Sequence, residues 1–157
     1  MSLLIRNLLF TIIVACSGAV WIPSWILTHS GGTSEPKAWS AVILIALGGV
    51  LYLACLWVFA TVGRGTPGPW DAPRRFVAVG PYRWVRNPIY IAALLVVIGE
   101  AWLFLSPSLL LYAAAMGLFF HLFVMHYEEP RLQGSFGDAY IDYLRTVPRW
   151  IPRRPQR

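Results

Sequence analysis

The chain has 157 residues, of which 57% are hydrophobic and only 13% are charged, and its formal net charge is +6. A water-soluble domain of this length needs more charge to cover its surface, so the composition indicates one integral membrane domain over residues 1–157. The basic residues lie between and after the apolar runs and form no stripe, which argues against nucleic-acid binding.

Four apolar runs are long enough to cross a bilayer as helices. Turn-forming residues separate them, and the short Ser106-Pro107-Ser108 link makes the last two runs an antiparallel hairpin. The Gly48-Gly49 pair in the second run predicts close contact with a neighbouring helix. The predicted fold is therefore all-α, with four transmembrane helices at about 8–27, 38–62, 88–105 and 108–125.

The character of the sequence changes over residues 126–157, where charged residues alternate with large apolar ones. Apolar residues recur there at intervals of three and four, which predicts an amphipathic helix on the membrane surface, broken near Gly134 or Gly137. These residues are Leu132, Phe136, Tyr140, Tyr143 and Leu144.

The basic residues also predict the orientation of the chain in the membrane. With four spans, both termini share one side with the loop at 63–87, and that side collects twelve arginines against Lys37 alone on the other. Because positive charge marks the cytoplasmic side, we expect the termini, the amphipathic helix and any site near them to face the cytoplasm. The arginines are Arg6, Arg64, Arg74, Arg75, Arg83, Arg86 and the six after position 130.

The segment GPYRWVRNPIY (80–90) concentrates polar and aromatic groups just before the third run. Asn87 and Pro88 suit the cap and first position of a helix, whose free N–H groups, with the charge of Arg86, favour an anionic ligand. A purely structural interpretation is that Asn87 caps the helix and Arg86 contacts lipid phosphates.

Two adjacent acids, Glu128 and Glu129, follow the fourth run directly. They either complement a helix dipole or bind a ligand by accepting hydroxyl groups and offsetting positive charge. Arg86 and Glu128 begin and end the same predicted hairpin, so we expect both motifs to face one cleft.

Two ionisable residues inside the predicted spans support other functions. Glu100 is costly within a membrane, so it and His121 are the candidate working groups of a small transporter. A non-catalytic membrane assembly subunit is a further alternative. His121 and His126 project from different helix faces, so we expect no metal site. Cys16 and Cys55 lie in apolar runs and are interpreted as small buried hydrophobic residues.

The two motifs together resemble the isoprenylcysteine carboxyl methyltransferase family, to which the phospholipid N-methyltransferases are related. The resemblance spans about residues 63–152, whereas the first two spans match only as generic membrane helices. It rests on Gly80-Pro-Tyr-Arg-Trp-Val-Arg-Asn-Pro-Ile-Tyr90, the hairpin, and then Glu128-Glu129-x-x-Leu132-x-x-x-Phe136-Gly137-x-x-Tyr140-x-x-Tyr143-x-x-x-Val147-Pro148-x-x-Ile151-Pro152.

The resemblance implies an integral membrane methyltransferase that uses S-adenosylmethionine in a cytoplasm-facing pocket closed by the C-terminal segment, with a lipophilic or lipid acceptor entering from the bilayer. It implies a catalytic role for Arg86 near the reacting groups and for Glu128 as the candidate base. The cofactor-binding residues that it implies are Arg75, Phe76, Val77, Tyr82, Asn87, Pro88, Ile89, Tyr90 and Glu129.

The sequence departs from the prenylcysteine enzymes at two places. Those enzymes have a histidine where Asn87 stands, and an arginine before the acidic pair where this chain has Val124 and Met125. The methyl-transfer scaffold is therefore predicted more firmly than a prenylcysteine carboxylate as the acceptor. A thiol, an amine, a carboxylate and a phospholipid headgroup all remain open as acceptors.

Overall fold

The computed structural model describes residues 3–30, 35–63, 66 and 76–155, and the regular structure within these residues is entirely helical. The prediction of an all-α chain is confirmed for this part. The α-helices are α1 (Leu3–Phe10), α2 (Ile22–His29), α3 (Val42–Val58), α4 (Pro88–Leu103), α5 (Pro107–Phe123), α6 (Glu129–Phe136) and α7 (Asp138–Thr146). Short 3-10 or π turns extend or join them: η1 (Thr11–Ala15), η2 (Ser17–Trp21), η3 (Trp39–Ala41), η4 (Phe59–Gly63), η5 (Gly80–Arg83) and η6 (Val124–Glu128).

Three continuous helices in the described part are long and apolar enough to cross a membrane: Ile5–His29, Trp39–Gly63 and Pro107–Phe136. The predicted third span is the shorter apolar helix α4, which has 16 residues. At 1.5 Å per residue it rises about 24 Å, less than the roughly 30 Å of hydrocarbon in a bilayer. Three of the four predicted spans are therefore helices of full spanning length, and the fourth, α4, is shorter.

Helix α4 ends two residues earlier than predicted because a compact local motif stops it. Leu105 has a positive φ of 49°, and the Ser106 N–H donates to the Ala101 carbonyl at 2.9 Å, which is the Schellman pattern. The Ser106 hydroxyl then accepts from the Leu109 N–H at 3.3 Å and caps α5. One short link therefore ends one helix and starts the next.

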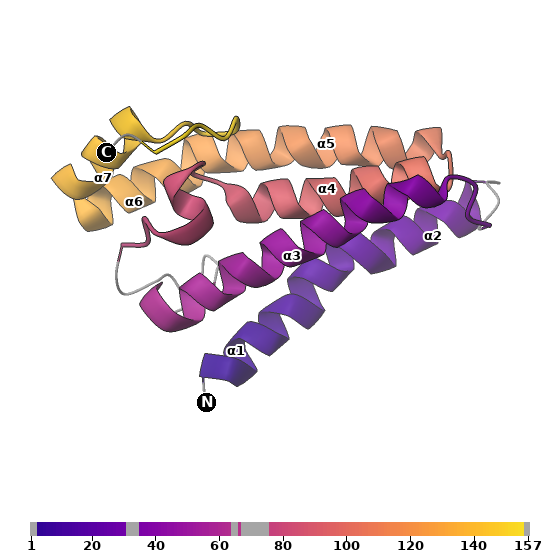
Figure 1. Cartoon of the computed structure of the whole chain (residues 1–157), viewed down its shortest axis with the longest axis horizontal. Coiled ribbons are helices and arrows are strands. Elements are labelled where there is room, and N and C mark those ends of the chain that lie inside the picture. The colour runs from indigo at the N-terminus through magenta and orange to yellow at the C-terminus, as the bar shows by residue number, and fades with distance from the viewer. Residues whose placement is uncertain (1–2, 31–34, 64–65, 67–75, 156–157) are drawn as a thin grey trace.

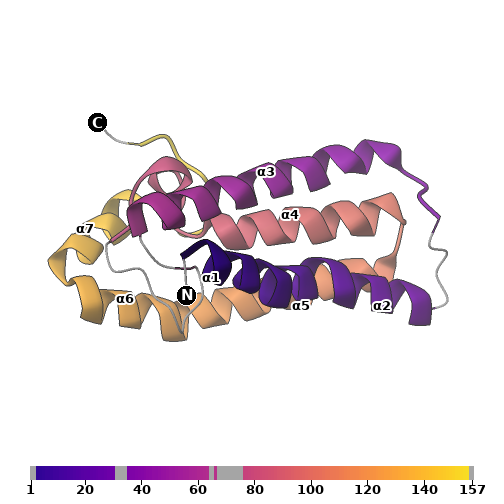
Figure 2. The ribbon, with the colours of Figure 1, turned by 90° about the horizontal axis from the view of Figure 1, so that it is seen from below.

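Close backbone contact joins α3 to α4. A Cβ atom at Gly48 would lie 2.7 Å from the Ala92 carbonyl oxygen and 2.8 Å from Val96, whereas one at Gly49 would meet nothing within 4 Å. The contact predicted for the glycine pair is therefore made by Gly48 alone. Figures 1 and 2 show α3, α4 and α5 running side by side.

Polar bonds and apolar contacts join the first helical span to the others. The Tyr112 hydroxyl of α5 donates to the Gly18 carbonyl at 2.8 Å, and Thr11 shares a 2.9 Å hydrogen bond with Tyr52 of α3. Leu27 packs against Leu109 in a buried cluster. Most other apolar side chains of this span are exposed, as expected where lipid surrounds a helix.

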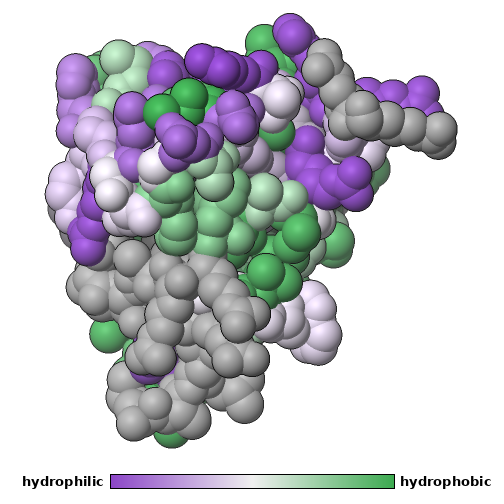
Figure 3. Space-filling view, turned by 90° about the vertical axis from the view of Figure 1, so that its left-hand side faces the viewer, coloured by the Kyte–Doolittle hydropathy of each residue, from purple (hydrophilic) through white to green (hydrophobic). Residues whose placement is uncertain are grey.

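The C-terminal part folds back over one end of the bundle. Helix α5 runs through η6 into α6 without interruption, and the chain then turns at Gly137, whose φ is +54°, into α7. The predicted break falls at Gly137, where glycine accepts the positive φ without steric cost. Residues 147–155, the C-terminal strap, return along the start of α4 (Figure 1). Hydrophilic residues gather at this end around a hydrophobic surface (Figure 3).

Candidate functional site

A cavity of about 130 Å³ lies where the start of α4 meets η6, α6 and α7. Side chains from the 80–90 segment and from the acidic pair both line it, so the predicted convergence of the two motifs is confirmed. Of the predicted site residues, those that line the cavity are Phe76, Val77, Tyr82, Arg86, Asn87, Tyr90, Glu128 and Glu129.

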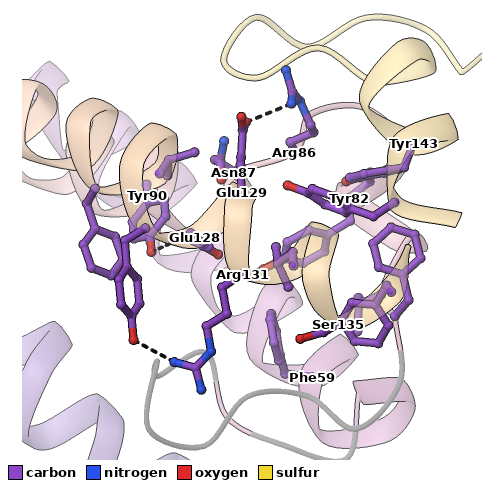
Figure 4. A pocket seen from close by; sticks show the side chains of 18 residues that line it. Phe59, Tyr82, Arg86, Asn87, Tyr90, Glu128, Glu129, Arg131, Ser135 and Tyr143 are labelled. Atoms are coloured by element: carbon purple, nitrogen blue, oxygen red, sulfur yellow. Dashed lines mark hydrogen bonds and ion pairs between the residues drawn. The ribbon is translucent and has the colours of Figure 1, made fainter. Parts of the chain in front are cut away.

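Glu129 is the centre of an ion-pair cluster at the upper edge of the cavity (Figure 4). Arg86 Nη1 donates to its Oε1 at 2.8 Å, and Arg149 donates from Nε and Nη2 to its two oxygens at 2.9 Å each. The hydrogen bonds that Arg149 donates to Glu129 raise the pKa of the Arg149 guanidinium. One carboxylate thus ties the start of α4 to α6 and to the C-terminal strap.

Glu128 points to a different partner. It accepts a 2.8 Å hydrogen bond from the Tyr90 hydroxyl, and the Tyr90 ring packs on Phe120 at 4.6 Å between centroids. The aromatic contact fixes the Tyr90 ring, so its hydroxyl holds one oxygen of Glu128 in place. Two adjacent acids therefore meet two different residues of the 80–90 segment.

Aromatic side chains form another wall of the cavity. Phe76 contacts Phe136, Tyr140 and Tyr143 with ring centroids 5.0 to 5.8 Å apart. The Tyr143 hydroxyl donates to the Tyr82 carbonyl at 2.7 Å. Burial raises the pKa values of the Tyr82, Tyr140 and Tyr143 hydroxyls, so these groups stay neutral near pH 7.

Asn87 precedes α4 as predicted, but its side chain makes no capping hydrogen bond. Its amide instead donates to the Arg149 carbonyl at 3.1 Å, because the strap lies within reach of the helix start. Pro88 is fully buried and does not line the cavity, and Ile89 packs against a cluster that contains Cys55. The predicted cofactor residue Arg75 lies outside the described residues.

The C-terminal strap is held by backbone and side-chain bonds. The Arg86 N–H donates to the Pro148 carbonyl and the Arg153 N–H to the Trp84 carbonyl, both at 2.9 Å. At the far side, Trp150 Nε1 donates to His121 Nδ1 at 3.0 Å. In this structure His121 therefore serves to fix the strap.

Sequence reasoning missed several residues of the site. Arg149 was only a basic tail residue, and Tyr127, Arg131 and Ser135 carried no assigned role, although all three line the cavity. A usable signal was present, since Tyr127, Arg131 and Ser135 follow one another every four residues and so share a helix face.

The long apolar helices support a membrane protein, and the cavity at one end of the bundle is lined by aromatic and charged side chains. The phospholipid methyltransferase family matches residues 36–139, well over half of the chain. The chain belongs to this family of integral membrane methyltransferases, which is related to the isoprenylcysteine carboxyl methyltransferases. A search of curated proteins returned no match.

The matched segment contains both motifs of the cavity but ends before the strap. It covers Arg86, Tyr90 and the acidic pair, whereas Arg149 and the rest of the strap lie beyond position 139. Membership of the family implies methyltransferase activity with a methyl donor, and apolar helices support an integral membrane location. The predicted methyltransferase family is therefore confirmed.

Proposed function

We propose that the protein transfers a methyl group from S-adenosylmethionine to a lipophilic or membrane-associated acceptor at the cytoplasmic membrane interface. One observation carries the proposal: Arg86 meets Glu129 and Tyr90 meets Glu128, both at 2.8 Å, beside one cavity. These contacts bring two features together. The start of α4 favours an anionic group, and the two carboxylates favour hydroxyl and cationic groups.

The residues around the cavity fit this cofactor. Arg86 Nε is buried and makes no hydrogen bond within the described part of the chain, so a carboxylate oxygen of the cofactor would satisfy it. Glu129 would accept ribose hydroxyls, and the rings of Phe76, Tyr82 and Tyr90 would line the adenine. Among these, Tyr82 is the most deeply buried.

When bound, S-adenosylmethionine supplies an electrophilic methyl group whose bond to sulfur breaks as the bond to the acceptor forms. The protein contributes position and protection from water, which supply much of the rate for such a displacement. Glu128 would take the proton of a protonated acceptor, and the Tyr90 hydroxyl would hold that carboxylate in position.

We expect the C-terminal strap to move when the cofactor enters. The cavity of about 130 Å³ is smaller than the roughly 300 Å³ at the lower end of ligand pockets. Arg149 occupies both oxygens of Glu129, so we expect entry of the cofactor to break those two hydrogen bonds and free the carboxylate for the ribose.

The test is a calorimetric titration of the detergent-solubilised protein with S-adenosylhomocysteine. We expect saturable binding by the wild type and loss of binding in an Arg86→Gln, Glu129→Gln double variant. Glu35→Gln is the control, because Glu35 is exposed and lies two residues before Lys37, whose N–H donates to Leu103 at the end of α4 far from the cavity. Absence of binding by a folded wild-type protein would overturn the proposal.

We further propose that all four helical spans cross the membrane, with the two termini and the cavity on the cytoplasmic side and α6 and α7 on the surface. The apolar stretch of the short helix α4 would be extended by Phe104 and Leu105, which follow the helix end. Lys37 is the only lysine of the chain and would lie outside. A membrane-impermeant amine reagent should label intact cells through Lys37, with Lys37→Arg as the control, and protection of Lys37 would contradict the orientation.

Transport is the second candidate function, because Glu100 Oε2 is buried and accepts no hydrogen bond within the described residues. The other predicted working group, His121, is engaged by Trp150. Loss of function in Glu100→Gln together with a silent Glu128→Gln would favour transport, and the reverse result would favour methyl transfer. Absence of both cofactor binding and transport would favour a non-catalytic assembly subunit.

A further inference from the structure

Two adjacent residues of the C-terminal strap bind different parts of the bundle. Arg149 donates to both oxygens of Glu129 at 2.9 Å each, whereas Trp150 Nε1 donates to His121 Nδ1 of α5 at 3.0 Å. Within the described residues, this indole–imidazole contact is the only hydrogen bond between the strap and α5. Neither ring lines the cavity. We call the Trp150–His121 hydrogen bond the strap latch.

The chemistry of the two rings fixes the direction of the latch. An indole N–H can only donate, so Nδ1 of His121 is the acceptor and carries no proton. A neutral imidazole with its proton on Nε2 meets this requirement, whereas an imidazolium has a donor on each nitrogen and no acceptor. Imidazole ordinarily changes its charge between about pH 5 and 8. The latch can therefore form only while His121 is neutral.

No other titratable group is bonded to His121 in the described part of the chain. Tyr90 is bonded to Glu128, and Arg149 to Glu129. His126 is exposed and makes no hydrogen bond to the strap among the described residues. The titratable or charged side chains on the helices around His121 and on the strap are His29 of α2, Tyr90 and Glu100 of α4, His126 and Glu128 of η6, Glu129 of α6 and Arg149.

We propose that His121 is a positioning residue, which holds the strap against the bundle through Trp150 while its imidazole is neutral and releases the strap when it is protonated. The latch contributes at the alkaline end of the imidazole range and is lost as the pH falls, because protonation removes the acceptor. Release of Trp150 frees the neighbouring Arg149 to leave Glu129. The latch rests on the contacts alone, and its effect on cofactor exchange rests on the proposed function.

The test is hydrogen–deuterium exchange of the detergent-solubilised full chain at about pH 5 and about pH 8, the two ends of the imidazole range. The reporter is the Arg153 N–H, which donates to the Trp84 carbonyl at 2.9 Å and follows Trp150 closely in the strap. After correction for the ordinary effect of pH on amide exchange, we expect about fivefold less protection at the lower pH, since one neutral hydrogen bond is lost.

Substitutions of the two rings separate the latch from other effects of pH. His121→Asn places a carboxamide oxygen, which does not titrate, close to the position of Nδ1, so protection of Arg153 should stay high at both pH values. His121→Phe removes the acceptor and Trp150→Phe removes the donor, and each should give low protection at both. His126→Gln is the matched control, because it removes an exposed imidazole of the same continuous helix, and it should respond to pH as the wild type does.

Two results of these exchange measurements would overturn the inference. One is equal protection of the wild-type strap at both pH values, and the other is a response to pH that survives in His121→Asn. The double variant His121→Phe, Trp150→Phe adds a further check. Its loss should be no greater than that of either single variant, because both remove the same bond, and additive losses would contradict the latch.

A second measurement connects the latch to the candidate site. We expect the dissociation rate of S-adenosylhomocysteine to rise about fivefold between pH 8 and pH 5 in the wild type and to stay constant in His121→Asn. An unchanged rate while strap exchange responds to pH would overturn the positioning role. Failure of the wild type to bind S-adenosylhomocysteine at either pH would instead overturn the proposed function, and the exchange measurement would still decide whether the latch exists.

Discussion

The two ends of the α4–α5 hairpin are built in opposite ways. At the turn between the helices, the Ser106 side chain and backbone help to satisfy both helix ends, and the Lys37 and Ala38 N–H groups add bonds to the Leu103 carbonyl at 2.8 and 3.1 Å. At the other end, three side chains bond to distant segments: Arg86 to Glu129, Tyr90 to Glu128 and Asn87 to the strap. The helix ends at the turn are satisfied mainly through main-chain bonds and one local cap, whereas the side-chain pairs at the other end form only when three segments meet.

This difference indicates at which end of the hairpin a ligand could form new hydrogen bonds. Local bonds at the turn satisfy the helix ends and leave Ser106 and Leu109 paired to each other. At the other end Arg86 Nε stays buried without a hydrogen bond in the described part of the chain, which is typical of a functional site. Substitutions at the two ends should therefore have different effects, and four of them test this in order of decreasing size.

Glu129→Gln should have the largest effect, because it removes the charge that holds two arginines. We expect the free energy of unfolding to fall by about 3 kcal/mol and S-adenosylhomocysteine binding to be lost, since partly buried charged hydrogen bonds are broken. Thermal denaturation and calorimetry measure the two effects. Asp142→Asn, which breaks an ion pair whose side chains are 76% exposed, should change neither. Equal losses in both variants would contradict the special role of Glu129.

Tyr90→Phe should have the next largest effect at the same end. It keeps the ring on Phe120 but leaves a Glu128 oxygen without its donor, so we expect a loss of about 1.5 kcal/mol in thermal denaturation. Tyr127→Phe is the control, because the Tyr127 ring is exposed and water can replace its hydroxyl bond to Arg131. A stability loss in the control as large as in Tyr90→Phe would count against the buried contact.

Ser106→Ala should be milder and confined to stability. Loss of the cap on α5 costs about 1 kcal/mol, because the Leu109 N–H loses its acceptor. Binding of S-adenosylhomocysteine should stay at the wild-type level, since this turn is at the far end of the hairpin from the cavity (Figure 1). A change in affinity would show that the two ends are coupled through the hairpin.

Leu105→Gly should give the smallest effect, with the opposite sign. Leu105 holds a φ of 49° that a side chain disfavours, and it is 59% exposed, so little packing is lost with it. We expect a gain of up to about 1 kcal/mol, because relief of strain outweighs the greater freedom of glycine in the unfolded chain. A drop in melting temperature would show that Leu105 contributes packing or membrane contacts that outweigh the strain.

Much of the fold follows from the sequence because its signals are local. Apolar runs of spanning length, proline at helix starts and glycine at turns predicted the helices, the hairpin and a break near Gly134 or Gly137. The order of the two motifs around the hairpin also predicted that Arg86 and the acidic pair share one cleft. That inference needed only antiparallel helices of similar length, which the short link at Ser106 imposes.

The pairing of individual side chains is different, because it depends on the placement of segments that the sequence does not relate. The sequence pattern did not specify that Arg86 pairs with Glu129 and Tyr90 with Glu128. Adjacent residues on a helix differ in direction by about 100°, so the sequence does not tell which of the two acids faces Arg86. It also gave no sign that Arg149 completes the cluster or that Asn87 bonds to the strap.

The sequence by itself determined the class of protein, the helices and the meeting of the two motifs. Composition and hydrophobic periodicity are properties of the sequence alone, so they can be read without any knowledge of tertiary contacts. Only the tertiary structure decided which carboxylate each residue meets and that Arg149 of the strap bonds to Glu129. Hydrogen bonds at 2.8 Å require the folded positions of α4, α6 and residues 147–155 together, and no local pattern encodes those positions.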